Sequence, residues 1–178
     1  MPIQRFLHPA LMLATLLITR PAFATAPVMP GVEVPPGEFN EALGALATLT
    51  TWRDQPPMYV ELCDAVDPAG TPARRSLVDR WRTQHAADLD RIAGYEDRIA
   101  PVMYQIEGIH SADPGRQLRE NSQARIRSQL SAKPHDEMLK KCTGFAGLMI
   151  FNEPVIAPIR NSAFATLDRW VAKQGAKR

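Results

Sequence analysis

The sequence lacks the short motifs that identify the common catalytic and cofactor sites. It contains no G-x-S-x-G nucleophile turn, no glycine-rich phosphate loop, no H-E-x-x-H zinc helix and no C-x-x-C-H haem attachment site. It also lacks the alternating Val, Ile and Thr runs, separated by turn residues, that are typical of β-hairpins. These absences leave no particular enzymatic reaction to propose, and we expect no cofactor.

The chain also lacks a large net charge of either sign. The chain has 21 Lys and Arg residues against 19 Asp and Glu residues. Its first 24 residues contain Arg5 and Arg20 but no acid, so their removal would leave a formally neutral protein. Because a nucleic-acid-binding protein normally needs a basic surface to neutralise phosphates, we expect no nucleic-acid partner.

The first 24 residues have the pattern of a secretory signal peptide. Arg5 precedes an apolar segment at residues 10–18, and Ala22 and Ala24 are the small residues of a cleavage site. The apolar segment is shorter than the ~20 residues that span a bilayer. A retained membrane anchor is the weaker alternative, favoured only by the charge of Arg20. We therefore expect export to the periplasm or the extracellular space, with no transmembrane segment after cleavage.

The chain that follows the predicted signal peptide, residues 25–178, is long enough for one domain with its own core. Its start, residues 25–37, contains four prolines and two glycines and shows no helical period. This composition predicts a Pro-rich extended leader. A segment that docks on a partner is the alternative, although the ends of mature chains are usually loose. The helical domain is expected to occupy residues 38–178.

The strongest helical pattern extends from Thr71 to His110. Thr71 and Pro72 are typical of a helix start, a capping hydroxyl followed by a proline. At 3.6 residues per turn, the apolar residues that follow form one stripe. They are Leu77, Trp81, Leu89, Ile92, Tyr95, Ile99, Val102 and Ile106. Because proline lacks a backbone N–H and clashes with the preceding turn, Pro101 predicts a kink or break near Ala100.

Shorter helices are predicted on both sides of this segment. Their expected ranges are 38–53, 57–66, 115–130, 134–149 and 158–173. No segment is predicted to form a strand. The sequence therefore indicates an all-α fold, a single-domain irregular bundle of five or six helices with short connections.

The chain contains only two cysteines, Cys63 and Cys142. Each lies on the apolar side of a predicted helix, and export would place both in an oxidising compartment. We therefore predict that a disulfide bond joins them. A redox-active thiol is the alternative, but the C-x-x-C spacing is lacking. A metal site is also disfavoured, because these cysteines have no histidine at ligand spacing.

Two polar residues interrupt the apolar stripe of the 71–110 segment. His85 lies within the stripe, and Asp88 follows three residues later on the same face. A carboxylate beside an imidazole can tune a general base or supply two metal ligands. We favour the simpler interpretation, a structural histidine whose ring hydrogen-bonds Asp88 or a neighbouring carbonyl oxygen. Glu96 and Glu107 are the acids nearest to the apolar edge of this helix, and neither completes a site.

Residues 115–133 form the most basic part of the chain. Arg116, Arg119 and Arg127 share one helix face, with only Glu120 opposing them in this segment. Such a partner surface would suit an acidic protein, peptidoglycan carboxylates or anionic lipid. A solvated helix is the simpler interpretation, since the apolar residues of this segment form no broad face.

Two functional hypotheses follow from these patterns. The favoured one is a secreted or periplasmic, non-enzymatic helical binding or accessory protein. It would dock another envelope or secreted protein, for example as an inhibitor, an immunity factor or an envelope-assembly factor. The alternative is a small helical enzyme or metal-binding protein that uses His85 and Asp88. The expected disulfide, the neutral charge of the processed chain and the lack of catalytic motifs favour the first hypothesis.

The processed protein is expected to begin at Thr25, because cleavage after Ala24 fits the pattern of small residues at a signal-peptide site. Cleavage after Ala26 is the second choice. An intact-mass measurement on protein recovered from its native envelope should give the mass of residues 25–178. Protein that keeps residues 1–24 and stays in membranes would contradict the cleavage and, with it, the oxidising compartment.

Overall fold

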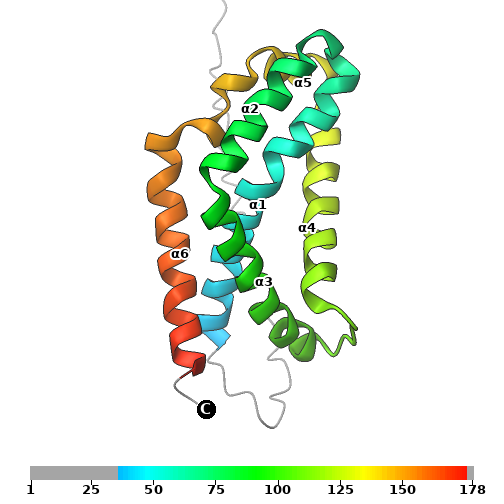
Figure 1. Ribbon diagram of the computed structural model, residues 1–178. Helices are drawn as coiled ribbons and strands as arrows, with labels where there is room; N and C mark the ends of the chain where they lie inside the picture. The colour runs from blue at the N-terminus through cyan, green and yellow to red at the C-terminus, as the bar shows by residue number, and fades with distance from the viewer. Residues whose placement is uncertain (1–35, 176–178) are drawn as a thin grey trace, which may run out of the picture.

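The chain folds into six α-helices, which the computed structural model describes for residues 36–175 (Figure 1). They are α1 (Pro36–Val66), α2 (Thr71–Gln84), α3 (Ala86–Glu107), α4 (Pro114–Ser131), α5 (His135–Thr143) and α6 (Glu153–Gly175). Short 3₁₀ turns occupy Pro68–Gly70, Phe145–Gly147 and Met149–Phe151. No strand occurs between residues 36 and 175. The predicted all-α, single-domain bundle is confirmed.

Helix α1 packs against all five of the other α-helices. Helices α1, α3, α4 and α6 alternate in direction, α2 runs the same way as α3, and α5 lies across the end of the bundle where α1 finishes (Figure 1). Helix α6 runs antiparallel to α1, since Lys173 near its end donates to Glu38 near the start of α1, at 2.6 Å. Tyr95 of α3 donates a hydrogen bond to Asp168, which ties α3 to α6.

Two clusters of buried side chains fill the bundle, and α1 contributes to both. The first joins the N-terminal half of α1 to α2, α3 and α6, and includes Leu46, Leu49, Trp52, Trp81, Ile92, Ile99, Phe164, Leu167 and Trp170. The second joins the C-terminal half of α1 to α2, α4 and α5, and includes Met58, Tyr59, Cys63, Val78, Ile126, Leu130, Met138, Cys142 and Phe145. Because each large apolar side chain that is fully buried contributes about 1.5–3 kcal/mol, α1 is stabilised along most of its length.

Helix α1 continues through Pro56 and Pro57, so the prediction of two separate helices at 38–53 and 57–66 is wrong. A proline inside a helix costs ~3 kcal/mol or more, because a backbone hydrogen bond is lost. Here Pro56 is almost fully buried, and Met58 and Tyr59 directly after it belong to the core. Tertiary packing on both sides of the prolines outweighs the lost backbone bonds.

The break in the predicted 71–110 helix lies at His85, and the break expected near Ala100 is absent. His85 has φ −109° and ψ 17°, outside the helical region, and separates α2 from α3. Pro101 lies inside α3, on its exposed side, while Tyr104 one turn later is buried. Because α3 keeps its contacts with the core after Pro101, the helix continues through the proline.

The remaining helix boundaries follow local chemistry. Helix α4 starts one residue before the predicted 115–130 helix, because the Asp113 side chain accepts from the backbone N–H of Arg116 at 3.0 Å. The predicted 134–149 helix is too long, since α5 ends at Thr143 and is followed by Gly144 and two 3₁₀ turns. Helix α6 begins at Glu153 and includes Pro158, which the sequence had suggested as its start.

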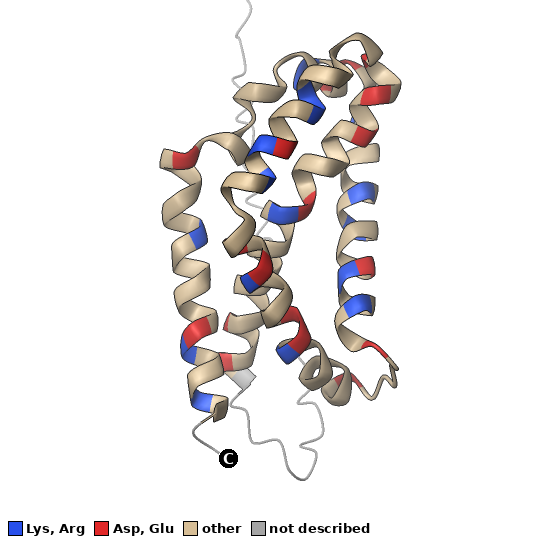
Figure 2. Cartoon of the chain, in the orientation of Figure 1, with Lys and Arg blue, Asp and Glu red and all other residues tan. Residues whose placement is uncertain are grey.

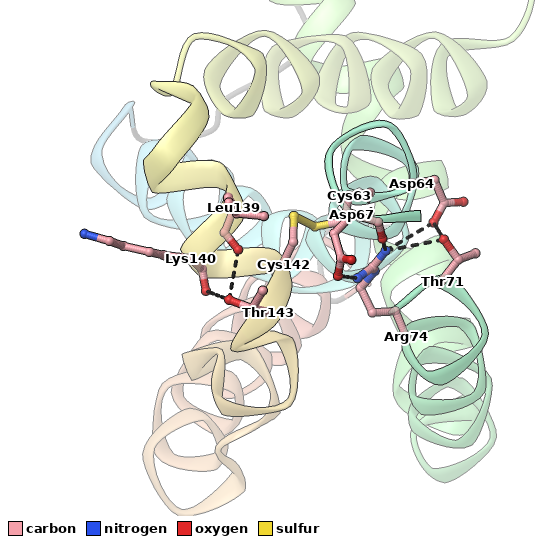
Figure 3. The surroundings of a disulfide bond; sticks show 9 residues. All are labelled: Cys63, Asp64, Asp67, Thr71, Arg74, Leu139, Lys140, Cys142 and Thr143. Carbon is pink, nitrogen blue, oxygen red and sulfur yellow. Dashed lines mark hydrogen bonds and ion pairs between the residues drawn. A yellow bond between two sulfur atoms is a disulfide. The ribbon is translucent and has the colours of Figure 1, made fainter. Parts of the chain in front are cut away.

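The predicted disulfide is present between Cys63 of α1 and Cys142 of α5, with a Cα–Cα distance of 5.4 Å (Figure 3). Beside it, the buried Arg74 of α2 donates to the Asp67 carboxylate at 2.7 Å and to the backbone carbonyl oxygen of Cys63 at 3.3 Å. The hydroxyl of Thr71 donates to the Asp64 side chain at 2.6 Å and does not cap α2 as predicted. Together these bonds hold the end of α1 against α2 and α5.

The predicted signal peptide, residues 1–24, and residues 25–35 of the predicted leader lie outside the described residues. Helix α1 begins at Pro36, within the range predicted for the leader. None of the helices between residues 36 and 175 combines the length and the apolar character that a membrane crossing requires.

Reduction of the Cys63–Cys142 bond is expected to lower the free energy of unfolding by ~4 kcal/mol in the chain-entropy account, because the unfolded chain regains the freedom of a long loop. Urea unfolding of oxidised and reduced protein measures this difference. The control is the double variant Cys63→Ala/Cys142→Ala, whose unfolding midpoint should not respond to reductant. Equal stability of oxidised and reduced wild type would contradict a stabilising role for the bond.

Candidate functional site

His85 lies at the junction of α2 and α3, among aromatic rings. Its ring centroid is 5.0 Å from that of Trp52 in α1 and 5.6 Å from that of Trp81 in α2. The centroids of the two indole rings lie 5.0 Å apart in an edge-on arrangement, which is one of the geometries that aromatic pairs prefer. Only 8% of His85 is exposed. The one non-helical residue between α2 and α3 is therefore fixed by packing against α1.

Arg160 of α6 belongs to the same cluster. Its guanidinium carbon lies 4.9 Å from the centroid of the Trp52 ring, a cation–π geometry. The guanidinium donates two hydrogen bonds to Glu153, at 3.0 and 2.5 Å, and its Nε lies 3.1 Å from the Asp88 carboxylate. Two carboxylates thus match one buried cation, and the ion pair with Asp88 links α6 to α3.

The hydrogen bond expected between His85 and Asp88 is not formed. Asp88 pairs with Arg160 and, at 3.7 Å, with Arg91. The carboxylate nearest to the imidazole is that of Glu153, 3.8 Å from Nε2, which is too long for a hydrogen bond. Within residues 36–175, no group of three or more His, Cys, Asp or Glu side chains is arranged to hold a metal ion. Aromatic packing, rather than a polar partner, holds the His85 ring.

The environment of this cluster sets its protonation. Burial lowers the pKa of His85, and the charge of Arg160 lowers it further, while Glu153 and Asp88 act in the opposite direction. Hydrogen bonds from Arg160 lower the pKa of Glu153. At neutral pH the imidazole of His85 is therefore neutral and the Glu153 side chain is a carboxylate. The contacts of this cluster join α1, α2, α3 and α6.

A second buried ionic cluster surrounds Glu96 of α3, which is 0% exposed. Glu96 accepts from Arg53 of α1 at 2.7 Å and from Arg119 of α4 at 3.4 Å. Arg53 also donates to both carboxylate oxygens of its neighbour Asp54, at 2.7 and 2.8 Å. Burial raises the pKa of Glu96, and the two arginines oppose this rise. This cluster joins α1, α3 and α4.

Glu96, named above as an acid near the apolar edge of this helix, occupies a buried position that the sequence pattern also indicated. Glu96 lies between Ile92 and Ile99 on the apolar stripe of α3, where an apolar residue is expected. The same departure from the pattern drew attention to His85. In both cases the residues that contact the side chain come from other helices. The apolar pattern therefore indicates which position is unusual, but it does not indicate what the polar residue does there.

The three arginines of the predicted partner surface are all paired with carboxylates. The pairs are Arg116 with Asp113 and Glu120, Arg119 with Glu96 and Asp97, and Arg127 with Glu61. Figure 2 shows several basic positions along α4 and one acidic position, Glu120, among them. Arg119 turns toward α3, and Arg127 reaches α1 at 2.8 Å. Two of the three arginines therefore fasten α4 to its neighbours, and acids offset the basic charge of this surface.

A hollowed surface that the sequence interpretation missed lies between α1 and α6. Two open hollows of about 600 Å³ and about 440 Å³ adjoin there, and both are lined by Thr48 and Ile159. We call the surface formed by the residues that line these two hollows the α1–α6 face. Its largest exposed apolar side chains are Met149, 61% exposed, and Ile159, 48% exposed, and Val155 beside them is 43% exposed.

The α1–α6 face is almost without charge. Among residues 36–175, Glu41 and Arg160 are the only charged residues that line its hollows, and Arg160 is buried. Residues 42–52 of α1 and 161–167 of α6 contain no Lys, Arg, Asp or Glu, and the uncharged part of α6 is visible in Figure 2. These two uncharged segments are visible in the sequence, but only the fold shows that they lie side by side and form one surface.

Comparison of the chain with protein-family models, curated proteins and solved structures finds no match. Its function is therefore inferred from its own residues. The clusters around His85 and Glu96 hold helices together, whereas the α1–α6 face is open to solvent.

The free energy of unfolding is expected to fall as the pH falls below ~6.5, because the pKa of His85 is lower in the folded protein than in the unfolded chain. The stabilising contribution of the neutral ring is complete above the unfolded pKa. It is lost as the pH falls through the folded pKa, since the unfolded chain takes up the proton first. His85→Gln should lack this component and should cost ~1–3 kcal/mol at higher pH through lost aromatic packing.

Chemical unfolding of wild type and His85→Gln between about pH 5 and pH 8 measures this component. His135→Gln is the matched control, because His135 is exposed at the start of α5, and it should keep the wild-type pH dependence. If wild type and His85→Gln lose stability in parallel on acidification, the assignment to His85 is wrong.

Proposed function

We propose that this chain is an exported, non-enzymatic helical binding protein that docks another protein on its α1–α6 face. In the periplasm or outside the cell it acts as an accessory protein, in the manner of an inhibitor, an immunity factor or an envelope-assembly factor. The observation that carries this proposal is the α1–α6 face itself, a hollowed and nearly uncharged surface on which Met149 and Ile159 are exposed.

The composition of this face suits a protein partner. Large apolar side chains that gather at one place on a surface are typical of interaction sites. Burial of an exposed Met or Ile side chain against a partner contributes up to about 1.5–3 kcal/mol, and methionine adapts to irregular surfaces because its side chain is unbranched. The small residues Gly44, Ala45 and Ser162 leave room in the neighbouring hollow for side chains of a partner.

The ionisable clusters support a binding role over an enzymatic one. A catalytic acid or base has to reach the proton that it transfers. His85 is enclosed by two indole rings, and Glu96 is completely buried between helices. Their contacts serve the packing of the bundle. The disulfide fits an exported protein, as does the signal-peptide pattern of residues 1–24.

Affinity capture from an envelope fraction with the purified protein tests this proposal. A captured protein, identified by mass spectrometry and then purified, should bind Ile159→Asp at least about tenfold more weakly than wild type, because a charge replaces an apolar anchor at the interface. Ile109→Asp is the matched control. Ile109 is exposed to a similar degree, 42%, but lies in the connection between α3 and α4.

The control variant should bind with the wild-type dissociation constant. A partner that binds Ile159→Asp as tightly as wild type docks elsewhere on the molecule, and this result would refute the assignment of the α1–α6 face. If no protein binds in a manner that depends on Ile159, the proposed function itself is wrong.

A further inference from the structure

The hollow of about 440 Å³ on the α1–α6 face borders the cluster around His85. Trp52 and Arg160 line this hollow. The ring of Trp52 also contacts the imidazole of His85, with 5.0 Å between the ring centroids. Arg160 binds the Glu153 carboxylate, which is the carboxylate nearest to the imidazole. A change in the charge of His85 therefore acts on two side chains in the wall of the hollow.

One carboxylate oxygen lies between two nitrogen atoms that can donate to it. Oε2 of Glu153 accepts from Nη1 of Arg160 at 3.0 Å and lies 3.8 Å from Nε2 of His85. The second distance is too long for a hydrogen bond. A protonated imidazole donates from both ring nitrogens and attracts a carboxylate. Because the Glu153 side chain is 40% exposed at the first position of α6, it has room for the shift of about 1 Å that would close this distance.

We propose that Glu153 exchanges Arg160 for a protonated His85, and that this exchange makes docking on the α1–α6 face dependent on pH. With a neutral imidazole, Glu153 and Asp88 both hold the guanidinium of Arg160. With a protonated imidazole, Glu153 binds His85, and Arg160 keeps only its ion pair with Asp88, 3.1 Å from its Nε. The inference rests on the proposed docking function and names the regulation of that site.

The groups around the imidazole place the exchange at acidic pH. Helices α1 and α2 face it with Trp52 and Trp81, which do not titrate. The charged groups that act on it are Asp88 of α3 and Glu153 and Arg160 of α6. Burial lowers the pKa of the imidazole and Arg160 lowers it further, so protonation occurs below ~6.5. The exchange is therefore absent at neutral pH.

The exchange weakens docking because it changes the pairing of Arg160 in the wall of the hollow. An apolar partner surface that covers the hollow removes water from this guanidinium. Burial of a charge is costly when its pairing is incomplete, and the protonated state leaves Arg160 with one carboxylate in place of two. Docking therefore favours the neutral imidazole, and acidification should raise the dissociation constant about fivefold or more.

Nuclear magnetic resonance of the purified protein between about pH 8 and pH 5 follows the exchange directly. The signals of the His85 ring, the Glu153 carboxyl carbon and the Arg160 guanidinium should shift with one midpoint. Glu153 itself titrates at lower pH, because hydrogen bonds from Arg160 lower its pKa. The methyl signals of Met149 and Ile156, which line the hollow, should follow the same midpoint.

Variants separate the exchange from a general effect of acid. His85→Gln should lose the shared midpoint, whereas His135→Gln, a change at an exposed position of α5, should keep it. In Glu153→Gln the carboxylate that changes partner is missing, so the Arg160 signals should no longer follow protonation of His85. Glu120→Gln, at an exposed acid of α4, should behave as wild type. If His85→Gln does not fold, the comparison of Glu153→Gln with Glu120→Gln decides.

The outcomes distinguish this inference from the proposed function. Arg160 signals that ignore protonation of His85, or that follow it equally in Glu153→Gln, overturn the exchange. A partner captured through Ile159 should bind wild type about fivefold or more weakly at about pH 5 than at about pH 7.5, and this difference should disappear in Glu153→Gln. A partner that binds wild type equally at both pH values overturns the regulation and leaves the docking function intact. If no protein docks through Ile159, the proposed function and its regulation both fail, even where the exchange itself is observed.

Discussion

Burial of α1 along its length is the constraint on which the rest of the structure depends. Three consecutive attachments lie on this helix: Trp52 packs against His85, Arg53 donates to Glu96, and Cys63 is bonded to α5. Each fastens a different part of the bundle to α1, which also contributes to both core clusters. Because neighbours support α1 on several sides, it tolerates Pro56 and Pro57, which would end an isolated helix.

The sequence predicted those parts of the fold that depend on local pattern. The apolar period of 3.6 residues indicated most of α2 and α3, and the two cysteines in a chain with an export pattern indicated the disulfide. Pro57 misled the prediction, and of the kink or break predicted near Pro101 the break is absent, because the compensation comes from core contacts made by distant residues. The break at His85 was missed for the same reason, since the ring of Trp52 that holds it belongs to α1.

The candidate sites divide in a similar way. A polar residue on an apolar stripe correctly marked His85 as unusual, but its closest charged neighbours, Glu153 and Arg160, lie on α6 and were not readable from the sequence. Glu96 obeyed the same rule and was set aside. The α1–α6 face is recorded in the sequence only as two stretches without charge. Their meaning depends on the antiparallel pairing of α1 and α6, which is a property of the fold.

The central claim is that α1 is one continuous, buried helix to which the other helices are attached. Amide hydrogen exchange resolved to single residues tests it most directly, because core segments exchange only through global unfolding whereas surface connections exchange through local opening. The amides of residues 58–63, directly after the two prolines, should be among the slowest to exchange, together with those of residues 46–52. Exchange at residues 58–63 as fast as in the connection between α3 and α4 would show that α1 ends at the prolines, and would contradict this account.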